Sequence, residues 1–433
     1  MRGARFSSRM CRALRGEQRR WTRNRILGFV AGVSLFVAVV SFLSPVDTDI
    51  TMYWMTAHRI FEQGVDPYIL QPGDRLLFVY PPTAFFLLYP FSELDVAQSS
   101  TLMLTANFVL AVILMAMIVG DLARDDPSRR LVLWGPLYVA AFGGLYLNMI
   151  FCQINLLVLL FLWLYWRQVR CSRRTWSSGG ALVLGCVAKP HYLLVALGAG
   201  PKPGFRIIAG ALIAGTALVG VSLALAPDGS WDTWVEGVLG EIGYRSLPGN
   251  LSSIAAPWNR SIPGFVARFL IPSKYIAPLV DSPFAAQFLS TVVILVLLAV
   301  SAWVLFRSIR RADREPRDRD LELSLISIFV FLASPASWTH HLVMLLPASL
   351  VMLRDGVLDR NEPVTSRLTV GLILVIIAFT FDDLIPREMR ISSLAIMSLM
   401  TVAVVALWLL IVERLLRRSA QCHDLSDSAT PSR

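Results

Sequence analysis

The stretch AQFLSTVVILVLLAVSAWVLF, residues 286–306, decides the fold, because it runs for 21 residues without a charged side chain. A helix of this length spans about 30 Å, the thickness of the hydrocarbon core of a bilayer. The sequence RSIRRADREPRDR, residues 307–319, follows directly and contains six arginines. An apolar run that ends in clustered arginines is typical of a transmembrane helix that ends in the cytoplasm.

The composition of the whole chain agrees with a membrane protein. Of 433 residues, 55% are hydrophobic and 16% are charged, so there is too little polar surface to cover a globule of this size. This excludes an ordinary cytosolic enzyme, a disordered protein and a nucleic-acid-binding domain. The net charge of +10 is carried almost entirely by arginines that lie between apolar runs, which indicates membrane topology rather than a nucleic-acid partner. The five cysteines form no CxxC pair and no metal-ligand spacing.

Further membrane-spanning helices are predicted at residues 26–44, 102–120, 131–150, 153–167, 206–226, 368–385 and 391–412. Two more apolar regions are interrupted by Pro, Lys or His. We interpret residues 180–199 as a re-entrant pair of half-helices, and residues 323–353 as two shorter segments that meet at residues 334–341. A full crossing by residues 180–199 is the alternative, and it would place residues 227–285 in the cytoplasm. The predicted fold is an all-α polytopic bundle of about 10–12 transmembrane or re-entrant helices.

Charge also divides the chain into regions. A basic tail, residues 1–25, holds nine arginines and one acid, whereas residues 45–101 hold seven acids and two arginines. The positive-inside rule therefore predicts that both tails, 1–25 and 413–433, are cytoplasmic. It places the loops 45–101 and 227–285 of the transmembrane domain, residues 26–412, on the outer face.

The first outer loop contains the first group of candidate site residues. From Ile50 to Gln63 the apolar residues recur at helical spacing, which predicts a short interfacial helix that is capped by Asp49 and ends at Gly64. Capping alone would also explain the acid. The polar and aromatic candidates of this loop are Asp49, Tyr53, Arg59, Tyr68 and Tyr80.

Two groups of polar residues interrupt the apolar runs that follow. Gln153 and Asn155 lie near Asn148 at the outer end of two crossings, where amides can also hydrogen-bond between helices without any further role. Lys189 and His191 flank a proline in the middle of an apolar run. A phosphate is a natural partner for a lysine that faces a cavity, and a structural ion pair is the alternative.

The sequence SPASWTHH, residues 334–341, forms the fourth group. Adjacent histidines lack the i, i+4 spacing of a helical metal pair, so no metal site is predicted. Together with Trp338, His340 and His341 suit an anionic, sugar-bearing ligand; an interfacial aromatic anchor is the alternative. Asn250 and Arg260, in the second outer loop, form a weaker fifth group.

These groups fit the transfer of a sugar from a lipid phosphate. A carboxylate would act as general base for an acceptor hydroxyl, while the lysine and the histidines would stabilise the leaving phosphate. No Gly-rich phosphate loop is present, so ATP is not expected, and no other cofactor is predicted. A transporter or flippase of a lipid-linked or anionic solute is the alternative, because broken helices also mark transporters. The motifs have no second copy in the other half of the chain, which favours the enzyme.

The chain also resembles the glycosyltransferase 87 family of GT-C-fold membrane enzymes. The resemblance rests on DITMY (49–53), GVDPY (64–68), YPPTA (80–84), QINLL (153–157), AKP (188–190), NLS (250–252) and SPASWTHH (334–341). It implies an inverting transfer, with mannose as the best-attested sugar, from a polyprenyl-phosphate donor to a glycan or glycolipid acceptor outside a bacterial plasma membrane. It also implies that Asp49 is the base and that a histidine of the last motif assists at the phosphate. Two positions depart from the family pattern: Cys152 replaces the usual glycine, and Leu251 replaces the common glutamine.

Overall fold

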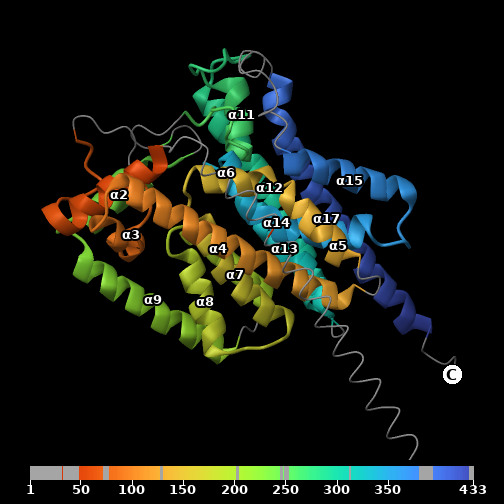
Figure 1. Ribbon diagram of the computed structural model, residues 1–433. Coiled ribbons are helices and arrows are strands. Elements are labelled where there is room, and N and C mark those ends of the chain that lie inside the picture. The colour runs from red at the N-terminus through yellow and green to blue at the C-terminus, as the bar shows by residue number, and fades with distance from the viewer. Residues whose placement is uncertain are drawn as a thin grey trace, which may run out of the picture.

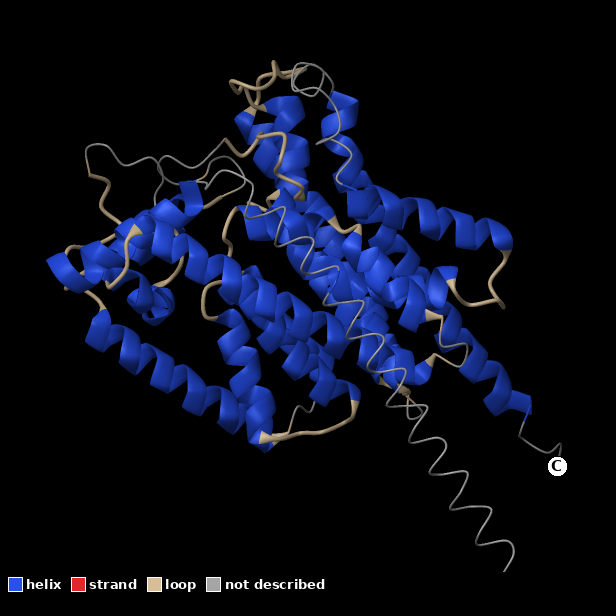
Figure 2. Cartoon of the chain, viewed as in Figure 1, coloured by secondary structure: helices blue, strands red, loops and turns tan. Residues whose placement is uncertain are grey.

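The computed structural model describes residues 48–71, 78–126, 130–200, 204–243, 253–311, 314–379 and 394–428, together with the single residues 32 and 247. The predicted first transmembrane helix, 26–44, and the candidate residue Asn250 lie outside this part of the chain. Within it the fold is a bundle of helices joined by short loops (Figures 1 and 2), and only two isolated β-bridges occur. This confirms the predicted all-α class.

Four single helices of the described part are long and apolar enough to cross a membrane. They are α4 (Val96–Leu122), α9 (Phe205–Leu225), α12 (Pro283–Ile309) and α17 (Leu394–Ser428). The helices α5 (Leu131–Ala140) and α6 (Gly143–Ile150) together are long enough for a fifth span and meet at an angle of 45°. The remaining helices that have ten or more residues are α2 (Thr48–His58), α7 (Asn155–Arg170), α8 (Trp176–Cys186), η4 (Pro190–Ala199), α13 (Pro316–Ala333) and α15 (Val364–Phe379).

Short helical segments complete the architecture. They are η1 (Arg59–Gln63), η2 (Pro82–Ala84), α3 (Phe85–Ser92), η3 (Ala123–Asp125), α10 (Ser230–Thr233), η5 (Trp234–Leu239), α11 (Ile262–Leu270), η6 (Thr339–Leu345), α14 (Leu346–Met352) and η7 (Leu353–Val357). Several of them mark the predicted breaks. The apolar run 180–199 divides into α8 and η4, and the run 323–353 divides into α13 and the η6–α14 pair. Pro190 and Pro335 lie at these interruptions. Proline has no backbone N–H and therefore cannot continue the hydrogen bonding of a helix.

The helix α2 bears out most of the prediction for the first outer loop. It continues into η1 and ends at Gly64, whose left-handed backbone (φ 63°) favours glycine. Its buried side chains, Ile50, Tyr53 and Ala57, share one face of the helix. The predicted N-cap is wrong: α2 already begins at Thr48, so Asp49 lies inside the first turn.

The helix α13 lies at the centre of the bundle and packs against α7, α12, α14, α17 and η4. Every side chain from Asp320 to Leu332 is buried, which is the pattern of a helix surrounded on all sides. The charged residues lie in its first two turns, and the irregular segment 334–338 begins at its other end. With a rise of about 1.5 Å per residue, some 20 Å separate these two ends.

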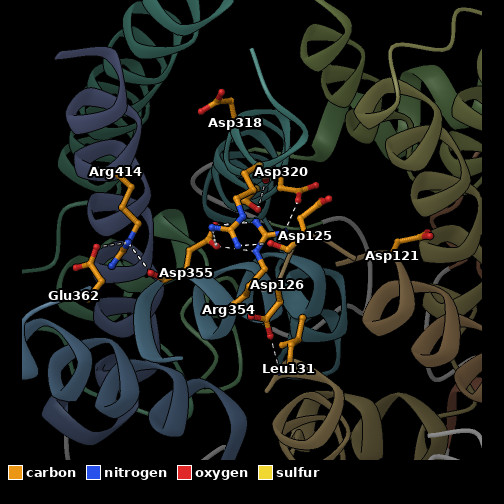
Figure 3. Close-up of polar contacts among 12 residues, drawn as sticks. Asp121, Asp125, Asp126, Leu131, Asp318, Asp320, Arg354, Asp355, Glu362 and Arg414 are labelled. Carbon is orange, nitrogen blue, oxygen red and sulfur yellow. Dashed lines mark hydrogen bonds and ion pairs between the residues drawn. The ribbon is translucent and has the colours of Figure 1, made fainter. Parts of the chain in front are cut away.

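A network of buried charges ties the first turns of α13 to neighbouring helices (Figure 3). The Asp320 carboxylate accepts from Arg354 Nη1 (2.9 Å), Arg170 Nε (2.8 Å) and Trp166 Nε1 (3.1 Å). Arg354 also holds Asp355 through two parallel hydrogen bonds of 2.7 and 2.8 Å. Asp320 thereby joins α7, α13 and η7 through side chains that are almost completely buried.

Close helix packing fixes α8 against α9. A Cβ atom added at Gly179 would lie 2.0 Å from the carbonyl oxygen of Ile207, and one at Gly210 would lie 2.0 Å from that of Trp176. Only glycine therefore allows the two backbones to approach this closely, as small residues commonly do between membrane helices. The contact holds α9 beside α8 (Figure 1).

Candidate active site

The predicted polar groups meet at one cavity of about 420 Å³. Its walls come from the start of α2, the segment before η2, the α6–α7 turn, the α8–η4 break and the α13–η6 loop. Nine of the predicted site residues line it: Asp49, Tyr53, Tyr80, Gln153, Lys189, His191, Trp338, His340 and His341. Residues separated by nearly 300 positions in the sequence therefore share one site.

A hydrogen-bonded group of four residues forms the carboxylate side of the cavity. Gln153 Nε2 donates to Asp49 Oδ2 at 2.5 Å. The carbonyl oxygen of the same amide accepts from the phenols of Tyr53 (3.2 Å) and Tyr80 (3.3 Å). Burial raises the pKa of both phenols, so they stay protonated as donors. The two tyrosines thus orient the Gln153 amide so that its N–H holds Asp49 in place.

The backbone immediately before Gln153 is strained. Cys152 has φ of 49°, a left-handed conformation that costs a residue with a Cβ atom about 1–2 kcal/mol. The backbone N–H of Gln153 then donates to the backbone carbonyl of Asn148 at 2.9 Å, which closes the turn after α6. This conformation explains why the family pattern has glycine where this chain has Cys152.

Lys189 forms the cationic side of the cavity at the break between α8 and η4. Its side chain is only 5% exposed, yet no ion pair or side-chain hydrogen bond of Lys189 occurs in the described part of the chain. Thr83 Oγ1 donates to the Val187 carbonyl at 2.7 Å and fixes the backbone just before the lysine. The structural ion pair considered for Lys189 thus finds no partner among the described residues.

The two adjacent histidines differ in their surroundings. The Trp338 backbone N–H donates to His341 Nδ1 at 3.2 Å, so the hydrogen of the neutral His341 ring is carried by Nε2. The His340 ring packs against Phe151, at 5.4 Å between centroids, and stands perpendicular to the His341 ring at 4.5 Å. Lys189 and His191 line the same cavity as both of these histidines.

Four predicted site residues lie outside the cavity wall. Tyr68 supports Tyr80 from behind, because its phenol donates to the Tyr80 carbonyl at 2.6 Å. Arg260 is fully buried behind η6, where its Nε donates to Thr339 Oγ1 at 3.2 Å. Asn155 is fully buried at the start of α7, and Arg59 begins η1. Direct substrate contacts by these four residues stay predictions.

Some residues of the site have no motif that would reveal them. Trp234 lines the cavity and donates from its indole N–H to the Val79 carbonyl at 3.2 Å. Leu239, Ile242 and Leu247 line the same side. They belong to the segment 227–285, whose apolar residues carry no pattern that distinguishes a cavity wall from a lipid-facing surface.

Comparison with known proteins identifies the family of the chain. The pattern of glycosyltransferase family 87 matches residues 78–335. A polyprenol-phosphate-mannose-dependent alpha-(1-2)-phosphatidylinositol mannoside mannosyltransferase of Mycobacterium tuberculosis is 27% identical over 387 residues, which are 84% of this chain and 83% of the relative. The enzyme of the same description from Mycolicibacterium smegmatis is 25% identical over 358 residues, 77% of this chain and 75% of the relative.

A third relative adds a different acceptor. It is a polyprenol-phosphate-mannose-dependent alpha-(1-2)-phosphatidylinositol pentamannoside mannosyltransferase of Mycobacterium tuberculosis, 29% identical over 292 residues, which are 66% of this chain and 60% of the relative. No solved structure matches the chain. The family pattern covers more than half of the sequence and includes Tyr80, Gln153, Lys189 and His191 of the cavity, whereas Asp49, Tyr53, Trp338, His340 and His341 lie outside the matched range. This protein is a multi-pass membrane glycosyltransferase that belongs to glycosyltransferase family 87.

Proposed function

We propose that this enzyme transfers mannose from a polyprenyl-phosphate donor to a hydroxyl group of a mannosylated phosphatidylinositol. The named activities of the three relatives support both substrates, and the alignment with the first of them covers most of both chains. The apolar side of the cavity, with Leu194, Leu239 and Ile242, suits a donor that is linked to a lipid. Family membership favours this enzyme over the transporter considered from the sequence.

The observation that carries the proposal is that Lys189 and Asp49 line the same cavity. A buried ammonium without a carboxylate partner in the described structure is a site for an anion. Asp49 is the one carboxylate among the described residues that line this cavity. A single carboxylate suits a single displacement with inversion, because a retaining mechanism needs one carboxyl group as nucleophile and another as acid/base.

The reaction then proceeds in one step. The acceptor oxygen attacks the anomeric carbon, its proton passes to Asp49, and the bond from that carbon to the phosphate oxygen breaks. The phosphate oxygen keeps the electron pair and leaves as polyprenyl phosphate, stabilised by the Lys189 ammonium. We assign the second phosphate contact to the Nε2–H of His341, because its Nδ1 is already occupied by the Trp338 N–H. No metal ion takes part in this scheme.

The proposal also includes an orientation, with the cavity on the outer face and both tails in the cytoplasm. The excess of arginine at residues 1–25 and 307–319 supports it. Cysteines introduced at the exposed positions Gln63 and Arg360 test it in a variant in which Cys11, Cys171 and Cys422 are replaced by serine. A membrane-impermeant maleimide should label Gln63→Cys from outside and Arg360→Cys only after permeabilisation; labelling of both from one side contradicts the orientation.

A transfer assay in proteoliposomes tests the activity itself. Polyprenyl-phosphate mannose with a radioactive sugar is supplied together with phosphatidylinositol mannoside, and both labelled glycolipid and free polyprenyl phosphate are measured. We expect Lys189→Ala to bind the donor more weakly, and Lys189→Arg to restore binding only in part. Asp228→Asn, at an exposed position of the second outer loop, is the control. Intact donor that reaches the other leaflet without release of polyprenyl phosphate would indicate transport instead.

A further inference from the structure

We propose that Asn259 is the positioning residue that fixes the ring orientation and tautomer of His341. The inference rests on the proposed function for the role of His341 at the phosphate. Asn259 itself does not line the cavity, and its side chain is completely buried. It lies in the second outer loop, just before α11, and it holds the loop that carries the histidines.

The side-chain amide of Asn259 makes hydrogen bonds on both of its ends. Its Nδ2 donates to the carbonyls of Pro335 (2.9 Å) and Ile254 (3.0 Å). Its Oδ1 accepts from the Ser337 backbone N–H at 3.0 Å and from the Ser261 hydroxyl at 2.9 Å. One amide therefore joins two segments that are more than 70 residues apart, and both of its donor hydrogens are used.

These contacts lead directly to His341. The Arg260 backbone N–H donates to the Ser337 carbonyl at 2.7 Å, and Asn259 and Trp338 form an antiparallel β-bridge. The backbone of residues 335–338 is thereby held on both sides of Ser337. The next N–H along the chain, that of Trp338, is the donor to His341 Nδ1. The position of this N–H, and with it the tautomer of the ring, thus depends on the Asn259 contacts.

The surroundings of Asn259 leave it no room to move. A Cβ atom added at Gly264 would lie 2.5 Å from the Asn259 side-chain carbon Cγ, so α11 closes directly over the amide. The guanidinium of Arg268, also completely buried, donates to the Asn259 carbonyl at 2.8 Å. Backbone and side chain of Asn259 are therefore both fixed, as expected for a group that positions another.

The chemical consequence concerns the hydrogen on the imidazole ring. With Nδ1 occupied, the Nε2–H of His341 is available to the phosphate oxygen on which charge develops. Without the Trp338 N–H in place, the ring can take the other tautomer or rotate, and the Nε2–H is lost from its position. A displacement of about 1 Å in such a group costs about 10²-fold in rate.

The kinetic test combines Asn259→Ala with His341→Ala. We expect Asn259→Ala to lower kcat about 10²-fold in the native background and less than about 3-fold when His341 is already alanine, because residues that act as a unit are not additive. Asn361→Ala, at an exposed turn, is the matched control and should leave kcat unchanged. An equal loss from Asn259→Ala in both backgrounds would show that Asn259 acts independently of His341 and would overturn the inference.

Nitrogen NMR of protein labelled with ¹⁵N-histidine gives a readout that needs no activity. The chain has five histidines, so the His341 signals are identified by their loss in His341→Ala. A non-protonated Nδ1 of His341 is expected in the native enzyme and should disappear in Asn259→Ala. If it persists there, the inference is wrong. If the two proteins differ in this way but the native enzyme transfers no mannose, the proposed function alone is contradicted. Should Asn259→Ala not fold, Gly264→Ala displaces the same amide and is read in the same way.

Discussion

Replacing Asp320 by asparagine removes the negative charge that joins two buried arginines at the first turns of α13. Both ion pairs are buried from solvent: the Asp320 and Arg354 side chains are at most 1% exposed, and that of Arg170 is 5% exposed. Breaking a buried pair by removing one partner typically costs 3–5 kcal/mol. Here each arginine keeps a second carboxylate, since Arg354 still holds Asp355 and Arg170 still holds Asp125.

Asp320 accepts charge-assisted hydrogen bonds from Arg354, Arg170 and Trp166, each worth about 1.5–3 kcal/mol. An asparagine carbonyl can keep those of Arg170 and Trp166 in weaker form, whereas the bond from Arg354 is lost because the asparagine NH₂ group cannot accept it. We expect the free energy of unfolding to fall by about 3 kcal/mol. Titration with SDS in mixed micelles, followed by tryptophan fluorescence, measures this difference. The mutant should remain folded in mild detergent, because native proteins have stabilities of about 5–15 kcal/mol.

The exposed pair of Glu413 and Arg417 provides the control. Its side chains are 47% and 54% exposed, and the residues are four apart on α17. Exposed pairs of this kind contribute less than about 1 kcal/mol, so Glu413→Gln should have little effect. Equal losses in Asp320→Asn and Glu413→Gln would refute the reasoning, since burial would then not determine what the charge contributes.

Four shorter predictions concern the site and its packing. Asp49→Asn should lower the transfer rate about 10²- to 10⁴-fold with donor binding retained, and a variant that keeps the native rate would contradict the role of Asp49 as the base. Cys152→Gly should raise the unfolding free energy by up to about 1 kcal/mol at unchanged kcat, because the left-handed backbone suits glycine; a destabilised but folded variant contradicts this. Gly210→Ala should lower the free energy of unfolding by about 1–3 kcal/mol through overpacking, whereas Gly215→Ala should not, because nothing lies within 4 Å of its added Cβ atom. Similar unfolding curves for the two variants would count against the α8–α9 contact. Finally, EDTA should leave the transfer rate unchanged, and activity lost in EDTA but restored by a divalent cation would disprove the metal-free scheme.

The parts of the fold that the sequence predicts well are those that depend on local chemistry. Uncharged runs of about 20 residues have few options other than crossing a membrane. The breaks at Lys189 and at Ser334 were predictable because proline and polar side chains interrupt apolar runs there. The convergence of Asp49, Lys189 and the histidines followed from the cost of burying such groups without a function.

The parts that it does not predict depend on contacts between distant residues. Asn259 is a single amide without a motif, and its partners Pro335 and Ser337 become neighbours only when α11 packs against the end of α13. The charge network likewise needs Arg170 and Arg354 to meet at Asp320, across 150 and 34 residues. The N-cap expected at Asp49 is wrong for a local reason, because α2 includes Thr48 and Asp49 lies inside its first turn.

We expect substrates to enter and leave through the walls of the cavity that α13 does not form. A helix that is buried on every side, with its charged end held by salt bridges, cannot shift without disturbing most of the bundle. Helix η5 is different: it packs mainly on its neighbour α10, and Val235 and Leu239 are 49% and 44% exposed. The α13 wall of the cavity, with Val330 and Ala333, is thus held by the rest of the bundle, and we expect the conformational change that admits a lipid-linked sugar to involve the segment around Trp234 instead.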